Sequence, residues 1–205
     1  MREVPEKCPA EHNTARPGTN QREGATMAIA INSIIIVLEL IGLYLCGRRG
    51  GWKILQYYTF LSNLITLFSS VLFLLAGEKA AWLRYTATCL LTMTFLVTLC
   101  ILVPMGAGFK TMMLTDSGLY YHTLCPILSA LSYLLWEKHA SAWFIPVIFT
   151  FVYGMVMLYL NWKGTVDGPY PFFKIKQQSA LATVVWMAAL TGAIALISLA
   201  IVSIP

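Results

Sequence analysis

Six long apolar runs take up most of the chain after residue 26. They lie near residues 27–46, 54–76, 81–103, 117–136, 143–162 and 179–203. Each has about the ~20 residues that a helix needs to cross the hydrocarbon core of a bilayer. A helix also satisfies its own backbone N–H and C=O groups, which lipid cannot do. The sequence therefore predicts an all-α, polytopic membrane protein with six transmembrane helices in one bundle.

The composition agrees with a membrane protein. Of the 205 residues, 58% are hydrophobic and only 11% are charged, whereas a soluble domain has about 25% charged residues. Tryptophan prefers the headgroup level of a bilayer, and five tryptophans stand at or near the ends of the predicted spans: Trp52, Trp82, Trp136, Trp143 and Trp162. We take residues 26–205 as a six-helix transmembrane domain.

Residues 1–25 differ from the rest of the chain. They are polar, contain three prolines and two glycines, and show no apolar periodicity. Such a segment cannot bury enough apolar surface to offset the entropy of ordering. We therefore predict a disordered N-terminal tail.

The distribution of basic residues does not orient the bundle. Six spans put both termini on the same side, together with the loops after the second and fourth spans. That side holds Arg2, Lys7, Arg16, Arg22, Lys79, Arg84 and Lys138, and the opposite side holds Arg48, Arg49, Lys53, Lys110, Lys163, Lys174 and Lys176. With seven basic residues on each side, the positive-inside rule favours neither orientation. If Met27 were the first residue, the side with the termini would hold three basic residues and the opposite side seven. The termini would then face outward.

A row of small polar residues runs along the second span. Thr59, Ser62, Asn63, Thr66, Ser69 and Ser70 recur at helical spacing and share one face of a helix. Such a face usually lets two helices approach closely and exchange hydrogen bonds. This packing role accounts poorly for Asn63, because a carboxamide at that depth needs several partners.

Polar groups also gather near one surface of the predicted bundle. Thr59, Glu39 and His122 lie roughly 6–13 Å below the same surface, at a rise of ~1.5 Å per residue. Asn161 and the segment 167–173 belong to that surface, together with several tyrosines that include Tyr121 and Tyr170. We therefore expect three separate helices to deliver polar side chains into one pocket.

Glu39 and His122 each allow a structural and a functional interpretation. A carboxylate at bilayer depth costs at least ~2.5–3.5 kcal/mol on insertion scales, so Glu39 should be paired or protonated. His122 is the only histidine within a predicted span. Haem ligation by two histidines and di-iron sites need more histidines than one, so we expect no metal and no cofactor.

Other classes of site find no support in the sequence. The five cysteines are odd in number and show no CxxC spacing, which disfavours a disulfide framework or a zinc site. No block of basic residues is interleaved with aromatics, so we expect no nucleic-acid partner. The expected partners are membrane lipids or a lipid ester, and nothing in the sequence indicates an oligomeric state.

Three motifs resemble a known family. "WKILQYYTFLSN" (52–63), "YYHTLCP" (120–126) and "GPYPFF" (168–173) resemble, in this order and spacing, the androgen-induced-gene family of membrane threonine hydrolases. They resemble its bacterial six-span relatives more closely. The resemblance implies a multi-pass protein of a bacterial cell membrane that hydrolyses fatty-acid esters of hydroxy fatty acids or similar lipid esters. It also implies that Thr59 is the nucleophile and His122 the base.

The remaining polar residues of the pocket then receive supporting roles. Asn63 or Ser62, one turn further into the second span, could donate a hydrogen bond to the oxyanion, and Glu39 could orient the imidazole as the acid of a triad does. We group Tyr121, Asn161 and Tyr170 with them as candidates for binding the substrate.

Two alternatives to a hydrolase stay open at this point. In the first, the protein is not an enzyme, the polar row serves packing, and the polar surface binds a lipid or a protein partner. In the second, Glu39 and His122 form the relay of a proton or small-solute transporter.

Overall fold

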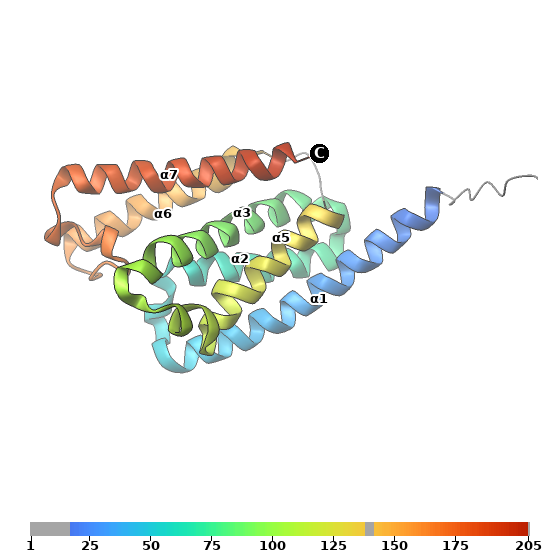
Figure 1. The fold of residues 1–205 in the computed structure, drawn as a ribbon, viewed down its shortest axis with the longest axis horizontal. Coiled ribbons are helices and arrows are strands. Elements are labelled where there is room, and N and C mark those ends of the chain that lie inside the picture. The colour runs from blue at the N-terminus through green and yellow to red at the C-terminus, as the bar shows by residue number, and fades with distance from the viewer. Residues whose placement is uncertain (1–16, 138–141, 205) are drawn as a thin grey trace, which may run out of the picture.

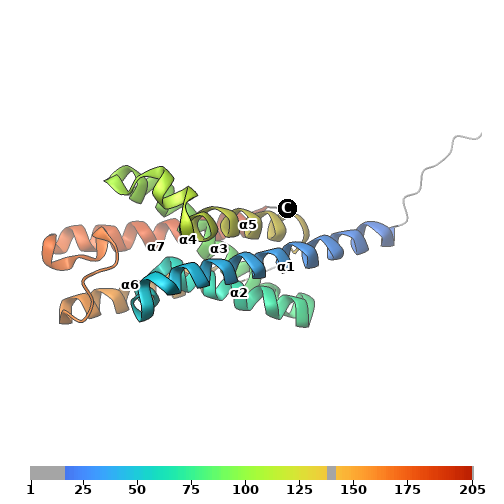
Figure 2. The same cartoon turned by 90° about the horizontal axis from the view of Figure 1, so that it is seen from below.

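The computed structural model describes residues 17–137 and 142–204, and every regular element within them is helical. Long helices run side by side along the long axis of the molecule (Figures 1 and 2). They are α1 Pro17–Gly50, α2 Tyr58–Ala76, α3 Ala81–Val97, α5 Cys125–Trp136, α6 Phe144–Lys163 and α7 Ala180–Ser203. The all-α prediction is thus confirmed for this part of the chain.

Short helical segments join these helices. They are η1 Gly51–Gln56, η2 Gly77–Ala80, η3 Thr98–Ala107, η4 Lys110–Leu114, α4 Asp116–Gly118, η5 Leu119–Leu124, η6 Pro171–Phe173 and η7 Ile175–Gln177. All except η2 lie toward one end of the bundle, on the left in Figure 1, while η2 lies at the other end. Successive helices therefore alternate in direction, and three connections meet at one end.

Four stretches of the described chain are long and apolar enough to cross a membrane. They cover residues 22–48, 58–107, 144–163 and 180–203, and the second of them contains both α2 and α3. The predicted span 117–136 is divided among α4, η5 and α5. The α-helical part, α5, has 12 residues and is only ~18 Å long at ~1.5 Å per residue, which is short for a bilayer core.

The first helix is longer than the sequence predicted. It begins at Pro17, so residues 17–25 are helical where we predicted part of a disordered tail. Proline at the first helical position costs no hydrogen bond, because the first N–H groups of a helix have no intrahelical partner. Residues 1–16 of the predicted tail lie outside the described residues.

The buried stripe of α1 shows an inverted polarity. Asn32 and Glu39 face the interior with Ile35 between them, whereas Val37 and Leu40 are about half exposed. The buried positions follow the i, i+3, i+4 spacing of a single helix face. Apolar residues point outward and polar ones inward, as expected where lipid surrounds a bundle.

The centre of the bundle is α3. It packs against α2, α5, α6 and α7, and every residue from 84 to 91 is buried. The small polar residues of α2 face this interior: Ser62, Asn63, Thr66, Ser69 and Ser70 are all fully buried, and Thr59 is half-buried. The row therefore faces neighbouring helices along its length and reaches open space only at Thr59.

Candidate functional site

A threonine and a histidine from different helices meet at the end of the bundle where three connections gather. The Oγ1 of Thr59, on the first turn of α2, lies 3.3 Å from the Nε2 of His122, in η5. Both side chains are half-buried. The structure thus brings together the two residues to which the resemblance assigns nucleophile and base.

The other nitrogen of the ring fixes the tautomer of His122. Nδ1 lies 2.8 Å from the carbonyl oxygen of Met112. A carbonyl oxygen can only accept, so Nδ1 must carry the proton. In a neutral imidazole Nε2 then holds a lone pair and accepts from the Thr59 hydroxyl, which is the protonation state that a general base needs.

The backbone around His122 departs from a regular α-helix for identifiable reasons. Pro126 has no N–H with which to bond the carbonyl of His122, four residues earlier, and η5 winds as a π-helix just before it. Gly118 allows the close approach of η4, because a Cβ there would lie 2.4 Å from the Met112 carbonyl oxygen. A side chain at position 118 would displace the group that orients His122.

Tyr170 completes the contacts of Thr59. Its hydroxyl lies 3.2 Å from Thr59 Oγ1 and accepts from the backbone N–H of Thr59 at 3.3 Å. Burial raises the pKa of the Tyr170 phenol above its ordinary value, although its hydrogen bonds with Thr59 oppose that shift. The phenol therefore stays neutral and keeps a proton that it can donate.

The loop between α6 and α7 holds Tyr170 in place. Asn161 Nδ2 donates to the carbonyl of Val166 at 3.0 Å, and its Oδ1 accepts from the N–H of Ile175 at 3.0 Å. The Tyr170 ring stacks on Phe172, with ring centroids 5.1 Å apart. Asn161, which we predicted among the substrate-binding residues, is buried and acts on the loop instead.

A cavity of about 580 Å³ opens beside the pair, and we call it the wide cavity. Its lining includes Thr59, His122, Tyr170, Tyr121 and Met112. A volume of several hundred Å³ is in the range of small-molecule sites. Of the predicted binding residues, Tyr121 and Tyr170 therefore do face the space next to the pair.

Ser62 and Asn63 lie elsewhere. Ser62 Oγ contacts the Thr59 carbonyl at 3.0 Å and Thr94 Oγ1 at 2.9 Å. Asn63 Nδ2 donates to the same carbonyl of Thr59 at 2.7 Å. Both side chains are fully buried and neither lines the wide cavity. They hold the first turn of α2 and are not oxyanion donors in this arrangement.

Glu39 does not orient His122 either. The two ring nitrogens bond to Thr59 and Met112, so the predicted role of Glu39 falls to a backbone carbonyl. Glu39 is buried in α1, and its Oε1 has no hydrogen-bond partner. It is not among the residues that line the wide cavity.

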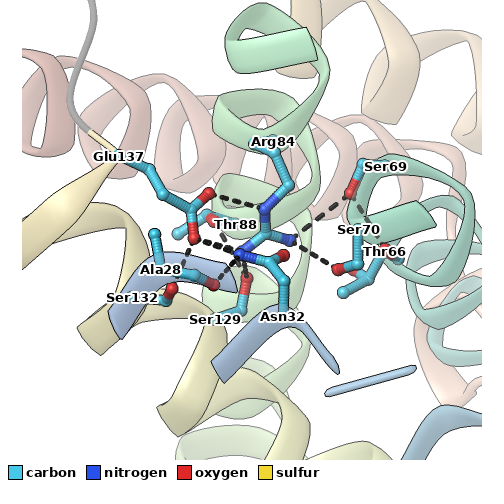
Figure 3. A network of polar contacts seen from close by, with 10 residues as sticks. All are labelled: Ala28, Asn32, Thr66, Ser69, Ser70, Arg84, Thr88, Ser129, Ser132 and Glu137. Atoms are coloured by element: carbon cyan, nitrogen blue, oxygen red, sulfur yellow. Dashed lines mark hydrogen bonds and ion pairs between the residues drawn. The ribbon is translucent and has the colours of Figure 1, made fainter. Parts of the chain in front are cut away.

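A second polar cluster was not predicted and lies toward the other end of α2 (Figure 3). Arg84 Nε bonds to Glu137 Oε2 at 2.8 Å, with both side chains fully buried. Nη1 of Arg84 reaches Ser70 at 3.2 Å, Asn32 donates to Glu137 at 2.6 Å, and Ser132 also bonds to Glu137. The sequence places Arg84 with the basic residues of the tail and loops on one side, whereas the structure buries it within α3.

Comparison with known proteins adds no relative to this description. No protein-family model, no curated protein and no solved structure matches the chain.

Proposed function

We propose that this protein crosses a bilayer six times, in the cell membrane of a bacterium, and hydrolyses lipid esters with Thr59 as nucleophile and His122 as general base. The family resemblance of the three motifs points the same way. In this proposal α5 together with α4 and η5 forms the fourth crossing. Non-helical or π-helical backbone at membrane depth is tolerated where it is buried or lines a cavity, as η5 does beside the wide cavity.

One observation carries the proposal. A threonine hydroxyl, the nitrogen of an imidazole and the carbonyl that fixes its tautomer form a continuous chain, from Thr59 through His122 to Met112. A threonine hydroxyl is a weak nucleophile and needs a base within hydrogen-bond reach. This series of hydrogen-bonded groups supplies the base, and Thr59 and His122 line the wide cavity.

The reaction follows from these positions. The Thr59 oxygen attacks the ester carbonyl while its proton passes to Nε2 of His122. The tetrahedral intermediate then breaks its bond to the alcohol oxygen, which takes that proton from His122 and leaves. A water molecule then gives a proton to Nε2 of His122 and attacks the carbonyl carbon of the acyl-threonine. As the bond between that carbon and the Thr59 oxygen breaks, the oxygen takes the proton back from His122, which releases the acid and restores the threonine hydroxyl.

Two features of the site can stabilise the oxyanion. Thr59 is the second residue of α2, whose N-cap residue makes no side-chain cap bond and whose first turn has no acidic residue, so the positive end of the helix dipole can act on negative charge there. The Tyr170 hydroxyl, which lies 3.2 Å from Thr59 Oγ1, can donate a hydrogen bond to the oxyanion that forms beside Thr59.

The proposal is tested by turnover in detergent or liposomes. Purified protein should hydrolyse long-chain esters, Thr59→Ala should remove activity, and Thr59→Ser should keep part of it. Thr92→Ala is the matched control, because the Thr92 hydroxyl donates to the carbonyl of Thr88 in its own helix, away from the site. Equal activity of wild type and Thr59→Ala, or no activity toward any lipid ester, would refute the proposal.

The two alternatives predict other outcomes. A non-enzymatic lipid-binding protein would bind esters without turnover. Neither the wild type nor Thr59→Ala would then hydrolyse them. A transporter relay needs Glu39 and His122 to exchange a proton, yet the two nitrogens of His122 bond to Thr59 and Met112. Proton flux lost in Glu39→Gln would nevertheless favour the relay.

A further inference from the structure

A second, smaller cavity meets the wide cavity at Thr59. It has a volume of about 40 Å³ and runs between α3, α6 and α7, and we call it the narrow crevice. Thr59, Leu102 and Tyr170 line both spaces. The nucleophile thus stands at the junction of a wide space and a narrow one.

The wall of the narrow crevice offers little to a polar ligand, although several of its residues carry hydroxyl groups. Tyr58 bonds to Thr150 at 2.8 Å, and Thr150 in turn donates to the carbonyl of Pro146. The hydroxyl of Tyr153 donates to the carbonyl of Gln56 at 2.7 Å. Thr94 donates to the carbonyl of Leu90 at 3.0 Å. With these hydroxyls paired, methyl and ring carbons are left to face the space.

The crevice leads from Thr59 into the bundle. Along η3 and α3 it passes Thr98 and then Met93, and on α7 it passes Met187 and then Leu190. Both directions lead away from the connections at the site end. Met187 and Thr191 are half-buried, so the crevice approaches the outer surface of the bundle at α7.

Gly154 and Met187 set the width of the crevice. A Cβ at Gly154 would lie 2.5 Å from Cε of Met187, so the thioether already fills the space that a side chain at position 154 would take. A single water needs about 10–15 Å³ on this scale, so the crevice holds only a few atoms unless Met187 moves. Methionine has three rotatable bonds and adapts readily to a ligand.

We infer that the narrow crevice binds the acyl chain of the ester, carbonyl carbon at Thr59, while the alcohol part lies in the wide cavity. This inference rests on the proposed hydrolase function. His122 lines only the wide cavity, and the alcohol oxygen must leave toward the group that protonates it. The acyl side should therefore be an unbranched hydrocarbon and be selected strictly, and the alcohol side should vary freely.

The first test compares acetyl, octanoyl and palmitoyl esters of one alcohol. Gly154→Leu should lower kcat/KM for the palmitoyl ester at least roughly tenfold more than for the acetyl ester, because removing room in an apolar pocket discriminates by about that factor. Val152→Leu places the same side chain at an exposed position of α6 and should leave the ratio of kcat/KM for the palmitoyl ester to kcat/KM for the acetyl ester unchanged. Met187→Ala should raise this ratio. Met155→Ala, at an exposed position of α6, is its control.

A second measurement does not depend on turnover. Palmitate carrying a diazirine on its chain is photolysed with the full-length protein, and the labelled peptides are identified by mass spectrometry. We expect label on residues of α3 and α7 that line the crevice, and its loss in Gly154→Leu. Met187→Ala, which only removes atoms, should keep the label and guards against a leucine variant that fails to fold.

The two experiments separate the inference from the function it rests on. Hydrolysis that is equally fast for all acyl lengths in Gly154→Leu, with no label on α3 or α7, overturns the crevice assignment and leaves the hydrolase standing. Label in the crevice without turnover of any ester supports a chain-binding crevice and overturns the hydrolase. Strict selection of the alcohol with loose selection of the acyl chain would reverse the assignment of the two cavities.

Discussion

The two ends of the polar row on α2 show two different uses of the same kind of residue. At one end, Thr59 meets His122 and Tyr170 beside a cavity of about 580 Å³. At the other, Ser69 and Ser70 meet the fully buried Arg84. We call the first group (Thr59, His122, Tyr170 and the Met112 carbonyl) the site cluster, and the second (Arg84 and Glu137 with their partners) the ion-pair cluster.

The difference lies in how completely each cluster is enclosed. In the ion-pair cluster both carboxylate oxygens of Glu137 have partners, and the guanidinium bonds to Glu137, Ser69, Ser70 and Ser129. Buried charges are tolerated only when paired and hydrogen-bonded in this way. The site cluster is neutral and half-open, so its groups can exchange protons with a substrate. We therefore assign the ion-pair cluster to holding helices together and the site cluster to chemistry.

The largest expected effect concerns the ion-pair cluster. Arg84→Met leaves Glu137 as an uncompensated buried charge, which should destabilise the protein by about 3–5 kcal/mol. Chemical unfolding in detergent measures this loss. Arg48→Met, which removes an exposed arginine, should change stability by less than about 1 kcal/mol. Equal stability of the two variants would contradict the structural role of the cluster.

The next effect concerns the site cluster and should fall on activity. His122→Gln removes the proposed base, so kcat should decrease about 10²–10⁴-fold. The unfolding free energy should change by no more than about 1 kcal/mol, because a half-buried neutral side chain is replaced by another polar one. A variant that fails to insert or fold would show that His122 is structural.

Tyr170→Phe should lower kcat by an amount between the effects of His122→Gln and Gly118→Ala. It removes one hydroxyl beside Thr59 Oγ1, and the loss of one oxyanion donor typically lowers kcat about 10²-fold or more. Tyr159→Phe, at a half-exposed position of α6, provides the matched control. A decrease in affinity without a decrease in kcat would instead place Tyr170 in substrate binding alone.

The smallest of these effects comes from Gly118→Ala. The new methyl group would press on the Met112 carbonyl and turn His122 away from Thr59, so kcat should decrease roughly tenfold or more. Gly192→Ala tests the same exchange where no atom lies within 4 Å of the added carbon, and we expect it to be neutral. Similar behaviour of the two variants would argue against the orienting role of Met112.

Much of the fold could be predicted from the sequence. Apolar runs of helix length indicated where α1, α2, α3, α6 and α7 lie, because lipid imposes length and backbone satisfaction together. The helical spacing of the row from Thr59 to Ser70 predicted a single face, and the structure buries all of that face except Thr59. Pro126 could have indicated that the span 117–136 is interrupted, because proline cannot bond to the carbonyl four residues earlier.

The details of both clusters were harder to predict. Spacing places a residue on a helix face, but it does not show whether a side chain points into a cavity. Ser62 and Asn63 were predicted beside the substrate, whereas both contact the Thr59 carbonyl and neither lines the wide cavity. A backbone carbonyl such as that of Met112 leaves no residue-type signal. Arg84 and Glu137 stand near the ends of apolar runs, where charged residues usually mark the headgroup region. Only the contact between Arg84 on α3 and Glu137, just after α5, shows otherwise.

The central claim is that Thr59 is the nucleophile of this bundle. The most direct measurement is the site of covalent modification after purified protein reacts with a fluorophosphonate probe, read by peptide mass spectrometry. We predict a phosphonyl adduct on Thr59 that persists in Thr66→Ala and disappears in Thr59→Ala. An adduct on another residue, labelling that survives in Thr59→Ala, or no labelling of the wild type would contradict this claim.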